Sequence, residues 1–425
     1  MYEQRLSRAL QFPTVSNSDY TAVDFAPYEA YIAFLQEAFP LFFQTCEWER
    51  INEYGLLFRW KGQDPTREPI LLLAHYDVVP ADDEGWTYPP FSGTVADGYI
   101  WGRGTIDIKS QQIAHFEAVE QLIKSGFTPA GDIYFAYGHD EEVGGEQGAD
   151  EIAQTLQARG LRFAGVLDEG GIVVSGALKG VTSPVALIGV GEKGRAEYAI
   201  TVAGRGGHAS MPPATTALGQ IAEVVRRIEK NPLPTRLTPP VLALLNAVSS
   251  QMGKPVELAL EHLNLSDRLV RKILSLTPET NAMIRTTFAA TMAKASDAGN
   301  VLPASATVNI DVRLLAGDTV DSVEAYFRKL AGRIPVEIRR VTATEATDFS
   351  PTSGVFYDRL FETTQRIFPE AITTPYLVCG GTDSRKYDVV SDHIYRFTPL
   401  HVTNAEKDTM HNRNEHVSIA SFDHM

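Results

Sequence analysis

Short apolar runs alternate with longer amphipathic segments between residues 69 and 167. The short runs have the composition of strands buried on both faces of a sheet, and they lie at residues 70–74, 132–137 and 163–167. The longer segments between them lie at residues 107–124 and 146–158. In the first of these, apolar residues recur at helical spacing, and Gly126 follows as a stop signal. The pattern predicts a β-α-β-α-β unit with parallel strands, which is typical of an α/β fold.

The pattern changes near residue 184, where apolar and polar positions begin to alternate as in antiparallel strands. Strands are predicted at 185–189, 196–202, 306–314 and 336–341, helices at 216–230 and 319–331, and a Pro-rich break at 231–240 before a mostly helical stretch. This order resembles a ferredoxin-like β-α-β-β-α-β domain with a helical insertion. We therefore predict an inserted α+β domain at residues 186–345. The first domain then comprises residues 1–185 and 346–425, and strand-like segments at 376–379 and 393–398 are expected to rejoin its mixed, parallel-rich sheet, which helices flank.

Length and charge narrow the class of protein. A chain of 425 residues is long enough for two or three domains. With 38 Lys and Arg against 53 Asp and Glu, the net charge is −15, which would repel a nucleic-acid backbone. The two cysteines cannot form a disulfide framework, and the chain shows neither a leader-like start nor an apolar run of about 18 residues. These features predict a soluble, cytoplasmic protein with no nucleic-acid or membrane partner.

Acidic and imidazole side chains follow the predicted parallel strands one after another. His75 and Asp77 follow the strand at 70–74, and the segment 139–142, His-Asp-Glu-Glu, follows the strand at 132–137. Asp168 and Glu169 follow the strand at 163–167, and Asp107 opens the first crossover helix. Ligands of open α/β sheets bind beyond the carboxyl ends of the strands, so these side chains are expected to meet at one edge.

Each of these residues has a plainer interpretation when taken alone. Asp107 could cap its helix, residues 140–142 could form a solvated loop, and His75 could be an ordinary core histidine. Their coincidence at one sheet edge favours a different explanation, because clustered carboxylates repel one another unless a cation neutralises them. We therefore predict a metal site.

Imidazole combined with carboxylates, without thiolates, suits zinc or a similar first-row ion. If Asp107 bridges two ions, then His75, Asp107 and one acid of the pair Asp168 and Glu169 hold the first ion. Glu142, Asp107 and a further histidine hold the second. Each ion then has three protein ligands, the usual number in catalytic zinc sites.

Two of the acids outside this assignment receive other roles. Glu141 lies next to a proposed ligand and is predicted to be the general base for the attacking water. Asp77 is predicted to fold back at the strand end and orient the ring of His75.

These residues occur in motifs that resemble those of the zinc-dependent aminoacylase, carboxypeptidase S, acetylornithine deacetylase and succinyl-diaminopimelate desuccinylase family of metallopeptidases. The motifs are LLLAHYDVVP, WGRGTIDIKS, GHDEEVGG, LDEGG, GRGGHAS, NVLPASATVNIDVR, GGTDSRKY and HNRNEH, between about Leu71 and His416. The resemblance implies two zinc ions, with cobalt or manganese as substitutes. It implies as ligands His75, Asp107, Glu142, His411 and an acid of LDEGG, with Glu169 favoured over Asp168. It also implies Glu141 as the base and Asp77 as the orienting carboxylate.

The resemblance further assigns residues outside the metal site. The inserted domain becomes a lid, whose His208 polarises the scissile carbonyl, often across a dimer interface, and whose Asn300 also contacts substrate. Gly381, Thr382 and Arg385 in GGTDSRKY become substrate-binding residues, with Arg385 on the substrate carboxylate. Without the resemblance, His208 would be read as a turn histidine and Arg385 as part of a surface salt bridge. Only ten residues follow Glu415, so we expect the family's terminal helix to be cut short or replaced.

The implied function is hydrolysis of the amide bond of an N-acyl amino acid or small peptide with a free carboxylate. The HYDVVP and VLDEGG forms favour an enzyme like aminoacylase or carboxypeptidase S over the biosynthetic deacylases. A dipeptidase or a biosynthetic N-deacylase of the same family is the alternative. A homodimer through the lid is also implied. A catalytically silent relative that only binds a ligand is the alternative from another class, and the presence of the base and of every implied ligand counts against it.

Overall fold

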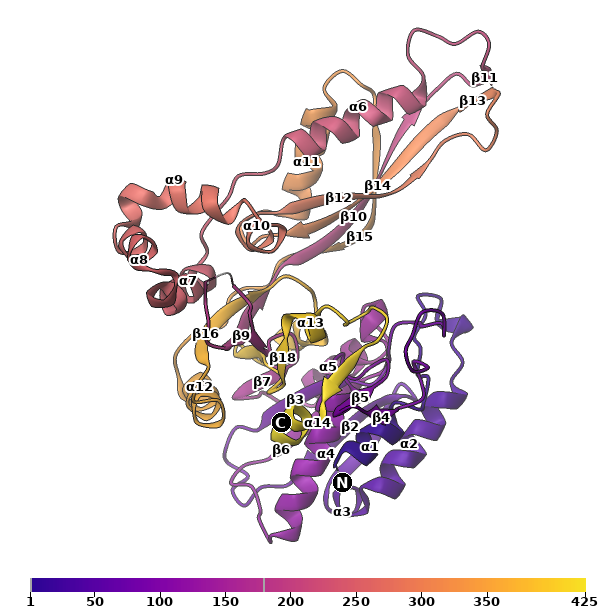
Figure 1. Ribbon diagram of the computed structural model, residues 1–425. Helices are drawn as coiled ribbons and strands as arrows, with labels where there is room; N and C mark the ends of the chain where they lie inside the picture. The colour runs from indigo at the N-terminus through magenta and orange to yellow at the C-terminus, as the bar shows by residue number, and fades with distance from the viewer. Residues whose placement is uncertain (1, 179) are drawn as a thin grey trace. The chain divides into compact units, whose positions relative to one another are not determined.

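The computed structural model describes residues 2–178 and 180–425. The chain forms two compact units, each with its own core (Figure 1). The first unit comprises Met1–Val190, Ser350–Tyr376 and Thr382–Met425, and the second comprises Gly191–Phe349 and Leu377–Gly381. The sequence pattern places the inserted domain at 186–345.

A mixed sheet forms the centre of the first unit, and ten of the described strands belong to it. The path through the sheet is β1 (Glu47–Ile51), β2 (Gly55–Trp60), β6 (Ile133–Gly138), β3 (Ile70–His75), β7 (Gly165–Asp168), β17 (Ile394–Arg396), β9 (Val185–Glu192), β8 (Val173–Ser175) and β18 (His401–Thr403). Strand β16 (Ile372–Val378) pairs with β9. The central pairs β6–β3, β3–β7 and β7–β17 are parallel, and β1, β2 and β9 pair antiparallel with their neighbours. The predicted α/β class with a parallel-rich mixed sheet is confirmed, and both C-terminal segments rejoin this sheet as expected.

Alternate residues of the central strands point to opposite faces of the sheet, and each face is covered. In β2 and β6, Phe58 and Phe135 face one cluster of buried side chains, whereas Leu57 and Ala136 face another. The first cluster is completed by α1 (Tyr2–Ala9), α2 (Ala26–Ala38), α3 (Pro40–Thr45) and α4 (Lys109–Lys124). The second is completed by α5 (Ala149–Ala158) and the 3-10 helix η3 (Asp383–Val389). Helix α12 (Val355–Ile367) packs with β9 and β17 in a further cluster.

A small three-stranded sheet joins two loops of the first unit that are far apart in sequence. It consists of β4 (Val95–Ala96), β5 (Tyr99–Trp101) and β19 (His416–Ser418), and His416 lies opposite Trp101. The remaining short elements are η1 (Tyr20–Ala22), η2 (Glu141–Val143), α13 (Asn404–Lys407) and α14 (Ile419–His424). Helix α14 has six residues.

The second unit is built on an antiparallel sheet of ferredoxin-like topology. Its strand order is β12 (Thr287–Lys294), β14 (Ser305–Leu314), β10 (Gly194–Ala203) and β15 (Glu337–Thr344). Helices α6 (Ala217–Lys230) and α11 (Val320–Ala331) cover one face of it, as Figure 1 shows. Strand β12 lies in the stretch that the sequence pattern described as mostly helical, so that description was incomplete.

The second unit also carries a helical insertion and a short strand pair. The insertion follows α6 and consists of α7 (Pro239–Met252), α8 (Lys254–Glu261), α9 (Leu263–Leu274) and α10 (Pro278–Ile284). The pair is formed by β11 (Gly207–His208) and β13 (Val301–Leu302). Across residues 2–178 and 180–425, we find no helix that is both long and apolar enough to span a bilayer.

Candidate metal centre

The candidate centre lies where β3, β6 and β7 end, as the topology predicts. His75 is the last residue of β3 and is only 1% exposed. Asp107 precedes α4 but does not cap it, because Ile108 is the N-cap residue and makes no side-chain cap hydrogen bond. The plain capping interpretation of Asp107 is therefore wrong. The peptide bond between Asp107 and Ile108 is cis.

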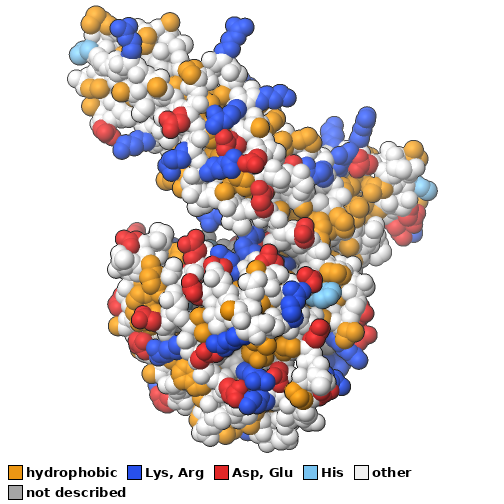
Figure 2. Space-filling view, turned by 180° about the vertical axis from the view of Figure 1, so that it is seen from behind, with side chains coloured by type: hydrophobic (Ala, Val, Ile, Leu, Met, Phe, Trp, Pro, Cys, Tyr) orange, Lys and Arg blue, Asp and Glu red, His pale blue; other side chains and the backbone are white. Residues whose placement is uncertain are grey.

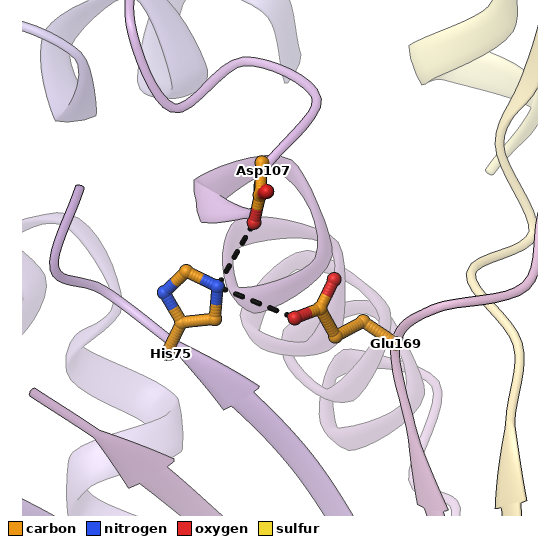
Figure 3. Close-up of side chains that lie close together, drawn as sticks. All are labelled: His75, Asp107 and Glu169. Atoms are coloured by element: carbon orange, nitrogen blue, oxygen red, sulfur yellow. Dashed lines mark hydrogen bonds and ion pairs between the residues drawn. The ribbon is translucent and has the colours of Figure 1, made fainter. Parts of the chain in front are cut away.

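His75, Asp107 and Glu169 form a first cluster of potential metal ligands. Nε2 of His75 lies 3.0 Å from Oδ1 of Asp107 and 3.4 Å from Oε1 of Glu169, and both acids point toward the ring in Figure 3. One ligand atom from each residue lies within 4.8 Å of the others. This spacing is compact enough for one cation to contact all three.

Asp107, Glu142 and His411 form a second cluster that shares the aspartate with the first. Nε2 of His411 lies 2.9 Å from Oδ2 of Asp107 and 3.2 Å from Oε1 of Glu142. Asp107 therefore turns one oxygen toward each histidine. The two clusters contain the same residues that the sequence analysis assigns to two ions.

The structure distinguishes the two acids of the LDEGG motif. Oδ2 of Asp168 accepts the backbone N–H of Ser384 at 2.7 Å, which ties Asp168 to the start of η3. Glu169 instead points to His75 and belongs to the first cluster. This geometry favours Glu169 as the ligand and gives Asp168 a structural contact.

Asp77 contacts residues of both clusters and is fully buried. Its Oδ1 lies 3.3 Å from Nδ1 of His75, as expected for an orienting carboxylate. The same side chain also accepts the backbone N–H groups of Glu141 and Glu142, each at 3.1 Å. Burial opposes ionisation of Asp77, yet these hydrogen bonds and the charge of His75 hold its pKa below the ordinary value. Asp77 thus positions the η2 turn as well as the histidine ring.

Glu141 belongs to neither cluster, although its carboxylate lies beside the first. Its Oε2 is 4.0 Å from Nε2 of His75, and the side chain is 14% exposed. Burial raises the pKa of Glu141 well above the ordinary value, against the favourable charge of His75. A carboxyl group with a raised pKa, next to a cation site but outside it, is suited to accept and return a proton.

The electrostatics of the metal-free protein show why a cation fits here. Burial, followed by the charge of Asp107, raises the pKa of Glu169 to about 8. Hydrogen bonds to Asp107 and Glu142 raise the pKa of His411 to about 10. Protons thus neutralise this cluster of acids when no ion is bound, and a divalent cation can take their place. The donors are three carboxylates and two imidazoles without a thiolate, which fits zinc or a similar ion.

His208 and Asn300, which are 92 positions apart, come together in the second unit. The backbone N–H of Ala209 donates to the carbonyl oxygen of Asn300 at 2.9 Å, and His208 lies opposite Val301 in the β11–β13 pair. The His208 side chain is exposed, and its Nδ1 accepts the N–H of Ser210 at 3.1 Å. Both residues belong to a different compact unit from the two clusters, so their role in catalysis remains a prediction.

The GGTDSRKY motif spans the junction of the two units. Gly381 ends the last segment of the second unit, and Thr382 begins the last segment of the first. Thr382 caps η3 by accepting the N–H of Ser384, and Arg385 follows within the same helix. Arg385 is therefore one residue from the group that holds Asp168. Substrate binding by these residues remains a prediction.

Glu415 is a residue of the site region to which the sequence analysis assigned no role. It is fully buried, and its Oε1 accepts the backbone N–H of Ile106 at 2.8 Å and that of Asp107 at 3.3 Å. Its Oε2 accepts a hydrogen bond from buried Arg103 at 2.5 Å. Glu415 therefore joins the loop that carries Asp107 to the loop that carries His411. The HNRNEH motif was its only signal in the sequence, because its partners lie 309 and 308 positions away.

We expect Glu415→Ala to lower the free energy of unfolding of the metal-free protein by about 3–5 kcal/mol, because the substitution leaves buried Arg103 without its counter-ion. Urea unfolding followed by circular dichroism measures the loss. The double variant Arg103→Met, Glu415→Met removes both charges and is expected to lose clearly less. A single variant as stable as the unchanged protein would contradict this account.

Comparison with known proteins agrees with the fold and identifies the family. The model of a family described as "Peptidase family M20/M25/M40" matches residues 71–425. The N-fatty-acyl-amino acid synthase/hydrolase PM20D1 of Xenopus tropicalis is 36% identical over 98% of this chain and 82% of its own length. Carboxypeptidase S of Saccharomyces cerevisiae is 30% identical over 98% of this chain and 81% of its own length. Among solved structures, the M20 family metallo-carboxypeptidase Sso-CP2 of Sulfolobus solfataricus has a TM-score of 0.73 at 16% identity, covering 100% of this chain and 96% of that one.

The family match and the curated relatives define an enzyme of the metallopeptidase and amidohydrolase class, and the two ligand clusters agree with that class. Within that class, the chain belongs to peptidase family M20/M25/M40. The resemblance drawn from the sequence motifs is confirmed.

Proposed function

We propose that this protein is a dinuclear zinc amidohydrolase that cleaves the amide bond of an N-acyl amino acid or small peptide with a free carboxylate. The observation that carries the proposal is the pair of three-residue clusters that share Asp107. The relatives support the substrate class, since several are named N-fatty-acyl-amino acid synthase/hydrolase and one is named carboxypeptidase S.

The chain's own residues suggest how the reaction proceeds. Two zinc ions, when bound, would polarise the scissile carbonyl and lower the pKa of the attacking water. His75, Asp107 and Glu169 would hold one ion, and Asp107, Glu142 and His411 the other. Glu141 takes the proton of the water and returns it to the leaving nitrogen of the amide. Asp77 fixes the backbone of Glu141 and the ring of His75 while the proton moves.

Metal analysis combined with a substrate panel tests this function. The purified protein should retain about two zinc ions per chain after dialysis and should lose activity with a chelator. The panel contains N-fatty-acyl amino acids, N-acetyl amino acids and dipeptides, each compared with its carboxamide analogue. A protein that holds no metal and hydrolyses none of these compounds would overturn the proposal.

His208 is proposed to stabilise the oxyanion that forms during attack. We expect His208→Ala to lower kcat by about 10²–10³-fold, since the loss of one oxyanion donor has this cost in other hydrolases. Steady-state kinetics measure the change. His262→Ala, at another exposed histidine of the second unit, is the matched control and should leave kcat unchanged. Equal rates for both variants would remove His208 from the reaction.

Arg385 is proposed to bind the free carboxylate of the substrate through a bidentate pair. We expect Arg385→Ala to raise KM by about 10–100-fold, because a hydrogen bond to a charged group contributes roughly 1.5–3 kcal/mol. Carboxamide analogues should show no such increase, and Arg385→Lys should recover part of the loss. If the variant raised KM equally for acid and carboxamide substrates, carboxylate recognition would not be its role.

The oligomeric state and the cellular location of the protein are also part of the proposal. We propose a homodimer through the second unit and a cytoplasmic location, both on the basis of the sequence analysis. Light scattering of the purified protein tests the dimer, since a mass near 46.7 kDa would show a monomer.

A further inference from the structure

Helix α9 of the second unit exposes a stripe of large apolar side chains. Leu265, Leu269 and Ile273 are spaced by four residues and are 84%, 57% and 54% exposed. Leu276, just beyond the helix, is 75% exposed, whereas Val270, which follows Leu269, is buried. Residues four apart lie on one face of a helix, so these side chains form a continuous apolar surface. A helix usually buries such a face against its own core, and one left exposed marks an interaction site.

Positive charges flank this stripe. Arg268 lies three positions after Leu265, and Lys272 lies three positions after Leu269, so each is next to the stripe on the helix surface. Asp267 is the one acid of α9, and it is paired with Arg271. Among the residues described, no ion pair joins Arg268 or Lys272 to an acid. This local excess of positive charge stands out in a chain whose net charge is −15.

A hollow of about 540 Å³ opens beside the same helix. Its lining contains four cationic side chains and no acid. The lining residues are Arg268, Arg271, Lys272 and Arg285, with Pro232, Leu233, Pro234, Thr235 and Ser275. The Nε atoms of Arg271 and Arg285 are buried without a hydrogen-bond partner in the described structure, although Nη1 of Arg271 donates to the Thr235 carbonyl oxygen and Nη2 of Arg285 to Oγ of Ser275. Burial also lowers the pKa of Arg285, which indicates a guanidinium held without a nearby anion. The hollow is therefore suited to an anionic group that accepts several hydrogen bonds, such as a phosphate.

We propose that α9 docks on an anionic lipid surface, with its apolar stripe entering the acyl boundary and the basic hollow binding a lipid phosphate. An amphipathic helix with apolar residues on one side and Lys and Arg at its margin has the composition of interfacial helices. Figure 2 shows hydrophobic side chains beside Lys and Arg over the end of the second unit that carries α8 and α9, with acidic side chains at its outer edge. On α8, Glu257 is paired with Lys254, while Glu261 is exposed and opposes the attraction.

Two other binding partners would match only part of the surface formed by the apolar stripe and the basic hollow. A free phosphate would fill the hollow but leave the stripe of leucines in water. A second copy of the chain would cover the stripe but bring the cations of two α9 helices close together, which costs energy. Docking would also depart from the expectation, drawn from the sequence, that the protein has no membrane partner. It does not depend on the proposed hydrolase activity.

Vesicle flotation of the full chain tests the proposal. We expect the protein to float with phosphatidylglycerol vesicles, not with phosphatidylcholine vesicles, and to be released by salt. The triple variant Leu265→Ser, Leu269→Ser, Ile273→Ser should bind at least about tenfold more weakly. The control Leu218→Ser, Met292→Ser, Val341→Ser replaces exposed apolar residues elsewhere on the same unit and should bind normally.

A second variant tests the charges without touching the stripe. Arg268→Gln with Lys272→Gln should weaken binding by about 30-fold, because each cation near an anionic surface contributes roughly 1 kcal/mol. Three results would overturn the proposal: no binding to phosphatidylglycerol vesicles, unchanged binding by the stripe variant, or a dimer in lipid-free buffer that the stripe variant dissociates. The last result would assign the stripe to contact between two copies.

Discussion

Replacing Glu141 with glutamine should lower kcat by about 10²–10⁴-fold while two zinc ions remain bound. The magnitude is that of a lost general base or acid. The ions should remain because Glu141 is in neither ligand cluster. Glutamine keeps the size of the side chain and leaves the backbone N–H of residue 141 available to Asp77.

Kinetics and metal analysis on the same preparation check this result. Glu146→Gln is the matched control, because Glu146 is an exposed acid of the neighbouring loop, and the variant should behave like the unchanged protein. Full activity of Glu141→Gln would remove the proposed base. Loss of zinc from the same variant would instead show that Glu141 acts as a ligand.

Asp107→Ala should remove both ions, which no other single substitution in the two clusters is expected to do. Asp107 is the one residue common to the two clusters, with Oδ1 near His75 and Oδ2 near His411. A group that only supports a metal ligand typically contributes 10–100-fold to affinity, so loss of a shared ligand should weaken each site by more than about 100-fold. Hydrolysis should then fall to background.

Zinc titration of the metal-free variants by calorimetry checks this prediction. Glu142→Gln and Glu169→Gln are the matched comparisons, since each changes only one cluster and should leave one ion tightly bound. Asp168→Asn should leave both ions bound, because its oxygen can still accept the Ser384 N–H. Two ions held normally by Asp107→Ala would contradict a shared ligand.

The sequence pattern predicts the elements that are buried on both sides. Strands β3, β6 and β7 are continuous apolar runs, and the crossover helices α4 and α5 show helical spacing between them. Strand β12 was missed for a physical reason: its sequence is TFAATMAK, most of its residues are exposed, and small alanines give no alternation of apolar and polar positions. Pairing with β14 holds β12 in the sheet, and this pairing does not change the order of apolar and polar residues within β12 itself.

Some of the proposed metal ligands could likewise be predicted from the sequence pattern, and others could not. His75, Asp107, Glu142 and Glu169 could be predicted because they follow strands whose order places their ends at one edge. His411 comes from an irregular loop with a positive φ of 57°, and only the family resemblance selected it among the histidines. The contacts of Glu415 and the second role of Asp77 depend on backbone N–H groups brought close by the fold, which residue types do not encode.

The separation of His411 from Glu142 by 269 positions bears on how the enzyme matures during translation. The ribosome must complete the whole inserted unit, Gly191–Phe349, before it makes the histidine that closes the second cluster. Domains generally fold as units while the chain is being synthesised, so the inserted unit has time to fold while the centre still lacks a ligand. The nascent chain should therefore stay inactive until His411 has left the ribosome, and metal loading of the second cluster should follow synthesis of the inserted unit.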